Sequence, residues 1–202
     1  MANVGGKSDG EIRLVEDERA RRIERQLEVA QQITHIGSWE WDVRTNSVTW
    51  SDELYRIYGL PPRSCNITLE FFLARLHEDD RARVHGHVGQ ALERGERFSY
   101  PERILRPDGS IRHLDTVGEA ARDASGVVTG LIGTCRDVTD ETRARKLQIA
   151  EQRILEMIAS GDALDAIFTT IVASIEEHSP PTIGSILLLT ADGKRVLHGA
   201  AP

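Results

Sequence analysis

The sequence predicts an α+β domain built around one antiparallel sheet, with long helices before and after it. Apolar and polar residues alternate between residues 37 and 51 with the period of two that a strand requires. Between residues 52 and 94 the apolar spacing becomes helical, and after Gly95 three strand-like segments follow. Two strands, several short helices and then three strands are the order of an α+β domain of about 100 residues.

The N-terminal region divides into a tail and a helix. Residues 1–10 are Gly-rich and polar, which predicts a disordered tail. Residues 11–33 contain no Gly or Pro and pair opposite charges four residues apart, which predicts an amphipathic helix. Its narrow apolar stripe suits a partner helix in a coiled coil and consists of Ala20, Ile23, Leu27 and Ala30. A solvated helix that only leads into the domain is the alternative, because fewer than three or four heptads are visible.

All three tryptophans lie in the first pair of predicted strands: Trp39, Trp41 and Trp50. A loop at residues 44–47 joins the strands, and if it closes symmetrically it pairs Val43 with Val48 and Trp41 with Trp50. Polar residues alternate with the indoles, so one face of the hairpin is expected to be buried. We therefore interpret the tryptophans as hairpin core rather than as an exposed platform for carbohydrates or bases.

Three helices are expected in the middle section. The run DELYRIYGLPP, from residue 52, reads as a short helix that ends at Gly59. Thr68 can cap a second helix over residues 69–76. The third helix, residues 78–94, has apolar residues at i, i+4 and i+8, and its acidic first turn is explained by the helix dipole without catalysis.

Three strands complete the domain, at residues 98–106, 111–122 and 127–137. The connecting segments PDGS, residues 107–110, and DASG, residues 123–126, have the composition of hairpin turns. The sheet should therefore contain five strands.

Four stretches carry a resemblance to a known family: GSWEWDVRTNSVTWSDELYRIYGL, LHEDDRARV, ERILRPDGSIRHL and GTCRDVTDETRARK. In this order they resemble a PAS domain, placed at residues 34–138. The chain departs from the common pattern at Glu78, where relatives often have Pro, and at His113, where they often have Trp. The resemblance implies a five-stranded antiparallel sheet with short helices packed on one face.

PAS resemblance also implies a small ligand cavity between the sheet and the middle helices. The candidate lining residues are Phe72, Leu76, Val84, Val88, Ile104, Leu114 and Ile132. Each of them could instead contribute to simple packing.

The run RDVTDE is similar to the Asp-x-Thr signature that ends PAS sheets, which implies a signal-relay role for Asp137 and Thr139. Thr139 can accept the free N–H groups of the next helix, while Asp140 and Glu141 favour the positive end of its dipole. A ligand that shifts the sheet would then move the exit helix. A plain helix cap without a signalling role is the alternative.

The C-terminal third reads as a linker helix and an incomplete domain. Residues 139–160 form a second apolar seam, typical of a coiled coil, with Leu147, Ala150, Ile154 and Met157 in steps of three and four. Residues 161–202 resemble the opening of a GAF domain, which predicts that the chain is a piece of a longer protein.

Histidine and cysteine are the residues of this chain that could bind haem, a metal ion or a flavin. His77, His85, His87 and His113 suggest haem or metal, but His85 and His87 would point about 200° apart on a helix. Only His85 remains as a single axial haem ligand, and satisfied or surface histidines are the preferred interpretation. Flavin binding needs an Asn-Cys-Arg-Phe-Leu-Gln pattern that Cys65-Asn66-Ile67 does not supply. We expect no metal site, no haem and no flavin.

Composition restricts the other functions. A net charge of −7 without a basic cluster argues against nucleic acid as a partner. The start of the chain lacks a signal peptide and no apolar run approaches the ~20 residues of a membrane span. Cys65 and Cys135 have no CxxC spacing, which fits a reducing cytoplasm. Motifs for phosphate loops, metalloproteases, kinase phospho-acceptors, GGDEF or EAL enzymes are missing, so these residues are not expected to form an enzyme.

Together these observations predict a cytoplasmic sensory module of a bacterial signalling protein, of the two-component kind. A small-molecule ligand or partner would act on the PAS unit, and the flanking helices would form a homodimer and pass the signal to a GAF and an output domain. Two alternatives remain open. One is a PAS scaffold that dimerises without a ligand, and the other is the N-terminal part of a histidine kinase or of a cyclic-di-GMP synthase or phosphodiesterase.

Overall fold

A computed structural model describes residues 9–178 and 182–201 and divides the chain into two compact units, of which the first ends at Val138. The first unit contains helices α1 (Asp9–Thr34), α2 (Asp52–Ile57), α3 (Leu69–Arg75) and α4 (Glu78–Arg94). Its strands are β1 (Ile36–Asp42), β2 (Ser47–Trp50), β3 (Phe98–Leu105), β4 (Ile111–Arg122) and β5 (Val128–Asp137). Most of the expected tail, residues 1–8, lies outside the described residues, and Asp9 and Gly10 already belong to α1.

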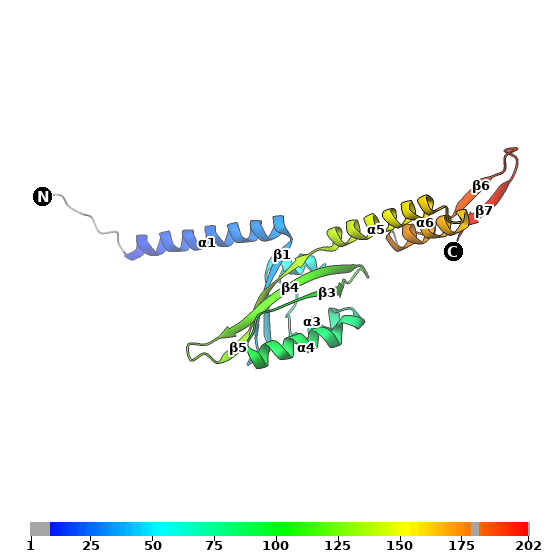
Figure 1. Cartoon of the computed structure of the whole chain (residues 1–202). Coiled ribbons are helices and arrows are strands. Elements are labelled where there is room, and N and C mark those ends of the chain that lie inside the picture. Colours follow the sequence, from blue (N-terminus) through cyan, green and yellow to red (C-terminus); the bar gives the residue numbers. More distant parts are fainter. Residues whose placement is uncertain (1–8, 179–181, 202) are drawn as a thin grey trace. The chain divides into compact units, whose positions relative to one another are not determined.

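The five strands form one antiparallel sheet in the order β2-β1-β5-β4-β3. Helix α2 packs on β1, and α4 packs on β3, β4 and β5. Figure 1 shows α3 and α4 together on one side of the sheet. The predicted α+β class and the five-stranded PAS-type sheet are confirmed.

The register of the first hairpin differs from the predicted one. Trp39 pairs with Trp50 and Trp41 pairs with Val48, so the predicted pairs Trp41–Trp50 and Val43–Val48 are wrong. The strand ends one residue earlier than predicted because Asp42 Oδ1 accepts the backbone N–H groups of residues 44 and 45, at 2.8 Å and 3.1 Å. Val43 therefore lies in the turn with 39% of its surface exposed.

Local sequence signals account for most other element boundaries. Ser51 caps α2 and Thr68 caps α3, each by accepting a backbone N–H group of the first turn. Gly95, at φ 66°, ends α4 in the left-handed conformation that favours glycine. In both predicted turns an aspartate accepts the N–H and hydroxyl of a serine two residues later: Asp108 with Ser110, and Asp123 with Ser125. The turn chemistry read from the sequence is confirmed.

Apolar side chains from α2, α3, α4 and the inner face of the sheet form the core. Eight of its members are less than 3% exposed: Leu54, Tyr58, Ile67, Leu76, Val84, Ile104, Leu114 and Leu131. Trp50 anchors one end, with its ring centroid 4.3 Å from that of Tyr58. At about 25 cal/mol per Å² of apolar surface, this burial is the main force that holds the helices on the sheet.

Two arginine contacts fasten the helices to the strands. Arg103 of β3 binds Asp80 of α4 through its guanidinium and its backbone N–H. Arg106, just after β3, donates to the carbonyl of Ile57 at 2.7 Å and to that of Arg56 at 3.2 Å. The second contact satisfies the Ile57 carbonyl at the end of α2, whereas the Arg56 carbonyl also accepts the backbone N–H of Gly59.

The second unit contains α5 (Thr139–Ser160), α6 (Leu164–His178), β6 (Ile186–Leu189) and β7 (Val196–Ala200). Helix α5 covers the residues expected for the linker helix and packs against α6, with an ion pair of 3.3 Å between Lys146 and Glu177. Strands β6 and β7 form an antiparallel hairpin. In both units, none of the described helices combines the length and apolar character needed to cross a membrane.

Candidate functional site: an aromatic cavity with a buried carboxyl group

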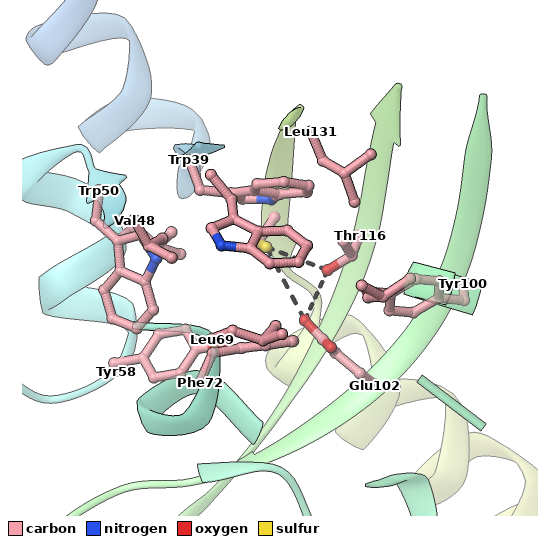
Figure 2. Close-up of a pocket in the computed structure, with 14 residues that line it drawn as sticks. Trp39, Val48, Trp50, Tyr58, Leu69, Phe72, Tyr100, Glu102, Thr116 and Leu131 are labelled. Atoms are coloured by element: carbon pink, nitrogen blue, oxygen red, sulfur yellow. Dashed lines mark hydrogen bonds between the residues drawn. The ribbon is translucent and has the colours of Figure 1, made fainter. Parts of the chain in front are cut away.

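The core of the first unit encloses a cavity of about 50 Å³ between the sheet and α2, α3 and α4 (Figure 2). Aromatic rings dominate its wall. The lining residues are Trp39, Trp41, Val48, Trp50, Leu54, Tyr58, Leu69, Phe72, Val88, Tyr100, Glu102, Thr116, Leu131 and Cys135. The space is therefore mainly apolar, with a few polar groups on the sheet side.

Two glycines make room for the rings that cross the sheet. Trp39, Gly133, Gly118 and Phe98 follow one another in register on neighbouring strands. A Cβ atom on Gly118 would lie 2.4 Å from the Phe98 ring, and one on Gly133 would lie 2.6 Å from Trp39. Because both positions lack a side chain, Trp39 and Phe98 stack with their ring centroids 6.2 Å apart. The glycines thus let the indole lie flat over the sheet at the edge of the cavity.

The polar part of the cavity is a cluster of three side chains on the inner face of β3, β4 and β5. Thr116 donates its hydroxyl hydrogen bond to Glu102 Oε1 at 2.7 Å. The thiol sulfur of Cys135 lies 3.1 Å from the Thr116 oxygen and 4.0 Å from Glu102 Oε1. Glu102 Oε2 is buried and has no hydrogen-bond partner among the described residues. Figure 2 shows the Glu102 carboxyl group pointing toward the indole rings.

Burial controls the protonation of this cluster. Glu102 is 2% exposed, and desolvation raises its pKa to about 7 although the Thr116 hydrogen bond acts in the opposite direction. Desolvation also raises the pKa of the Cys135 thiol, and the neighbouring Glu102 charge adds to the effect. The pKa values of Tyr58 and Tyr100 are raised for the same two reasons. Glu102 is therefore the lining group that changes its charge near neutral pH.

The family comparison agrees with the sheet topology. Residues 47–135 match the model described as PAS fold. The first unit therefore has the PAS fold. The structure of a sensory box histidine kinase/response regulator from Burkholderia thailandensis has 24% identity and a TM-score of 0.53, and the match covers 65% of this chain and 98% of that one.

Two curated proteins that are named as sensors are similar to this chain over part of their length. The methyl sulfide methyltransferase-associated sensor of Methanosarcina acetivorans is 33% identical over 128 residues, which are 63% of this chain and 13% of that protein. Sensor protein FixL of Bradyrhizobium diazoefficiens is 27% identical over 106 residues, which are 52% of this chain and 21% of that protein. The chain thus spans only about an eighth to a fifth of the length of these relatives.

The residues predicted to line the PAS cavity are divided by the structure. Phe72 and Val88 lie at its wall. Four others are buried in the surrounding core without lining it: Leu76, Val84, Ile104 and Leu114. The prediction for Ile132 is wrong, because β5 turns Leu131 inward and leaves Ile132 on the opposite face with 45% exposure.

The predicted hairpin core lies at the cavity as well. All three tryptophans line it, and Trp41 and Trp50 are 8% and 7% exposed. The Trp41 indole N–H donates to Asn46 Oδ1 at 3.1 Å, which ties the ring to the turn that follows β1.

The relay pair lies where the sheet ends and α5 begins. Asp137 is the last residue of β5, with its carboxylate 3.6 Å from the Arg112 guanidinium. Thr139 is the first residue of α5 and is buried, and Asp140 and Glu141 follow in the first turn as expected. Their role in signalling stays a prediction.

None of the four candidate histidines is among the residues that line the cavity. His85, the single haem ligand considered, is exposed on α4 and does not line the cavity. His87 stacks on Tyr100 with ring centroids 5.0 Å apart, and His77 accepts the backbone N–H of Asp79 at the start of α4. Among the described residues, no three potential metal ligands come together. The wall of the cavity therefore offers no histidine to a haem iron.

Sequence reasoning missed Glu102, Thr116 and Cys135. Glu102 could have been found from its position along the strand, because successive side chains of a strand point to opposite faces of the sheet. In SYPERIL, residues Tyr100, Glu102 and Ile104 share the inner face, so the glutamate is a charged residue in an apolar row. A carboxyl group at such a position has to be paired, protonated or functional.

Proposed function

We propose that the chain is the sensory part of a larger bacterial signalling protein, in which occupancy of the PAS cavity is relayed through α5. The observation that carries the proposal is the cavity itself: an enclosed aromatic space with a polar cluster on the sheet that leads into α5. Strand β5 contributes Leu131 and Cys135 to the wall, and one residue, Val138, separates it from α5. A ligand that prefers one arrangement of β5 would therefore bias the start of the helix.

The exposed helix surfaces support assembly as a homodimer through the flanking helices. On α1, Ile23 and Leu27 are each 56% exposed and Ile33 is 73% exposed. On α5, three apolar side chains are 55–59% exposed: Leu147, Leu155 and Ile158. Rows of this kind are what a parallel partner helix would cover in a coiled coil. In this proposal residues 161–202 begin a GAF domain, and the protein works in the cytoplasm.

The output reaction belongs to the longer protein. A histidine kinase or a cyclic-di-GMP enzyme fits the proposal equally well, since the PAS unit supplies the sensing and no catalytic residues of its own. A PAS scaffold that never takes a ligand is the alternative that the following experiment separates from a sensor.

A cavity-filling substitution tests the relay without knowledge of the ligand. Val88 is 8% exposed at the wall, so Val88→Phe should occupy the cavity as a ligand would. Hydrogen exchange of the whole chain, measured by mass spectrometry, should show altered protection at the start of α5. The matched change Val127→Phe, at a turn position that is 60% exposed, should leave α5 unchanged.

The outcome separates sensor from scaffold. Thermal melts verify that both variants fold, and Val88→Leu replaces Val88→Phe if the larger ring prevents folding. If the variant with the filled cavity folds and hydrogen exchange at the start of α5 is unchanged, the relay is contradicted. If Thr139→Ala abolishes the response and leaves the melting temperature nearly unchanged, the relay passes through the residue at which α5 begins.

A further inference from the structure

Two lining residues present buried polar atoms without a hydrogen-bond partner among the described residues: Glu102 Oε2 and Trp39 Nε1. The Trp39 indole lowers the pKa of the Cys135 thiol against the effect of burial, so its N–H already acts on a group of the protein. Glu102 Oε2 receives a hydrogen bond from no donor of the described residues. Native proteins leave few buried polar atoms unpaired, so this oxygen calls for a partner that the chain does not supply.

The rest of the wall determines the kind of partner. Six aromatic residues line the cavity together with Glu102: Trp39, Trp41, Trp50, Tyr58, Phe72 and Tyr100. The face of an aromatic ring carries partial negative charge and attracts cations, and the attraction grows when water is excluded. No lysine, arginine or histidine is among the lining residues, so an anion would find only the repulsion of Glu102.

The volume limits the size of the ligand. A cavity of about 50 Å³ exceeds the roughly 10–15 Å³ needed for one water molecule by a factor of about four. It therefore suits a ligand with few non-hydrogen atoms. A carboxylate within an aromatic wall of this size matches an alkylammonium ion better than a neutral molecule, because only a cation offsets the charge of Glu102.

We propose that the PAS cavity binds a small organic cation, a primary or methylated amine, with its ammonium group at Glu102 Oε2 and its alkyl groups on the aromatic rings. The inference rests on the proposed sensory function and names the ligand class of the same site. It makes Glu102 the residue that selects charge, and Trp50, Tyr58 and Phe72 the residues that select alkyl groups.

Charge near Glu102 sets the pH dependence of binding. Arg83 and Asp80 of α4 act on Glu102, and Arg83 lowers its pKa while Asp80 raises it. The charge of Glu102 in turn raises the pKa of Tyr58, just after α2, of Tyr100 on its own strand and of Cys135 on β5. In the empty protein desolvation holds the pKa of Glu102 at about 7, and a cation binds its ionised form. Binding therefore releases a proton, and affinity should rise with pH through neutrality by up to about tenfold per pH unit.

The experiment titrates the 202-residue chain with tetramethylammonium chloride and with tert-butanol, while tryptophan fluorescence and calorimetry record binding. These two probes have nearly the same shape, and only the first is charged. Methylammonium and ethylammonium chloride extend the series to smaller ions, and sodium chloride controls for ionic strength. At least one ammonium ion should bind about tenfold or more tightly than tert-butanol.

Glu102→Gln is the decisive variant because it keeps the shape and removes the charge. Affinity for the ammonium ion should fall at least about tenfold, its pH dependence should disappear, and affinity for tert-butanol should change less than about twofold. The matched control is Glu119→Gln, a glutamate exposed on the outer face of β4, which should bind as the unmodified chain does. If Glu102→Gln does not fold, Phe72→Leu supplies the second test, with an expected loss of about threefold or more for the cation.

Three results would overturn the proposal: no binding by any of the three ammonium ions, equal binding of tert-butanol, or equal ammonium binding by Glu102→Gln. The relay is tested separately by the cavity-filling variant Val88→Phe. If that variant changes α5 while the ammonium ions do not bind, the ligand class is wrong and the sensory function stands. If neither experiment responds, both proposals fall.

Discussion

Two buried carboxyl groups on neighbouring parts of the PAS domain behave in opposite ways. Asp80, in the first turn of α4, is 6% exposed, and Glu102, on β3, is 2% exposed. Asp80 accepts from the Arg103 backbone N–H at 2.8 Å and from its guanidinium at 3.0 Å, which lowers its pKa to about 2. Glu102 has one hydroxyl partner and one unpaired oxygen, and its pKa is raised to about 7.

The difference shows that burial alone does not decide the charge of a side chain. Asp80 is compensated by a guanidinium that reaches it in a bidentate geometry, so its charge is stabilised and holds α4 on β3. Glu102 has no cation in the protein, so desolvation dominates. A buried carboxylate that is paired with a cation of the protein has a structural role. A buried carboxylate at a cavity that has no such cation is a candidate for ligand binding.

The largest loss of stability is expected when the ion pair between Asp80 and Arg103 is broken. Asp80→Asn leaves the Arg103 guanidinium with only Asp79 nearby, at 3.1 Å, and takes away an acceptor of the β3 backbone. We expect a loss of about 3 kcal/mol in the free energy of unfolding at pH 7, toward the lower end for buried ion pairs because Arg103 is partly exposed. Urea unfolding followed by circular dichroism measures it.

The control for this prediction is Asp79→Asn, whose side chain is 64% exposed and should change stability by less than about 0.5 kcal/mol. The pH dependence gives a second check. Because the pKa of Asp80 is lower in the folded state, its contribution is present above its ordinary value of 3.8 and is lost as the pH falls through about 2. Equal stability of the Asp80 and Asp79 variants at pH 7 would contradict the structural role.

The next effect has the opposite sign. Glu102→Gln removes a buried charge, so at pH 9 it should stabilise the empty protein by about 2 kcal/mol. The raised folded-state pKa of Glu102 means that its contribution is present below 4.5 and is lost as the pH rises through about 7. At pH 4 the gain should therefore vanish. Unfolding curves at both pH values measure it, and a gain that is independent of pH would show that Glu102 is not the titrating group.

The contrast between the two carboxyl groups also marks what the sequence could predict. Alternation in residues 37–51 was enough to predict the hairpin, and the turn segments PDGS and DASG predicted the bounds of the later strands to within one residue. The register was not predictable from alternation, because the Asp42 side chain begins the turn. Ile132 was misplaced because Leu131 and Ile132 are both apolar, so the pattern does not tell which of them faces inward.

The candidate site was predictable only in part. Phe72 and Val88 followed from the resemblance to a PAS domain, whereas Glu102 looks like a surface glutamate unless the face of the strand on which it lies is known. The partner of Asp80 lies 23 residues away, in another element. Contacts of this range are set by the way in which α4 folds back on the sheet, and a helix-dipole explanation of residues 78–80 could not anticipate them.

The smallest of the three stability effects tests how far one hydrogen bond supports the Glu102 charge. Thr116→Val keeps the shape and removes the hydroxyl that donates to Oε1 at 2.7 Å, so the pKa of Glu102 should rise further. We expect a loss of about 1 kcal/mol at pH 9, where the carboxylate is charged, and a smaller loss at pH 5. Thr134→Val, on the exposed face of β5, is the matched control and should show no such pH dependence. If both variants lose the same stability at both pH values, the Thr116 hydroxyl does not support the charge, and the second oxygen of Glu102 cannot be singled out as the one in need of a partner.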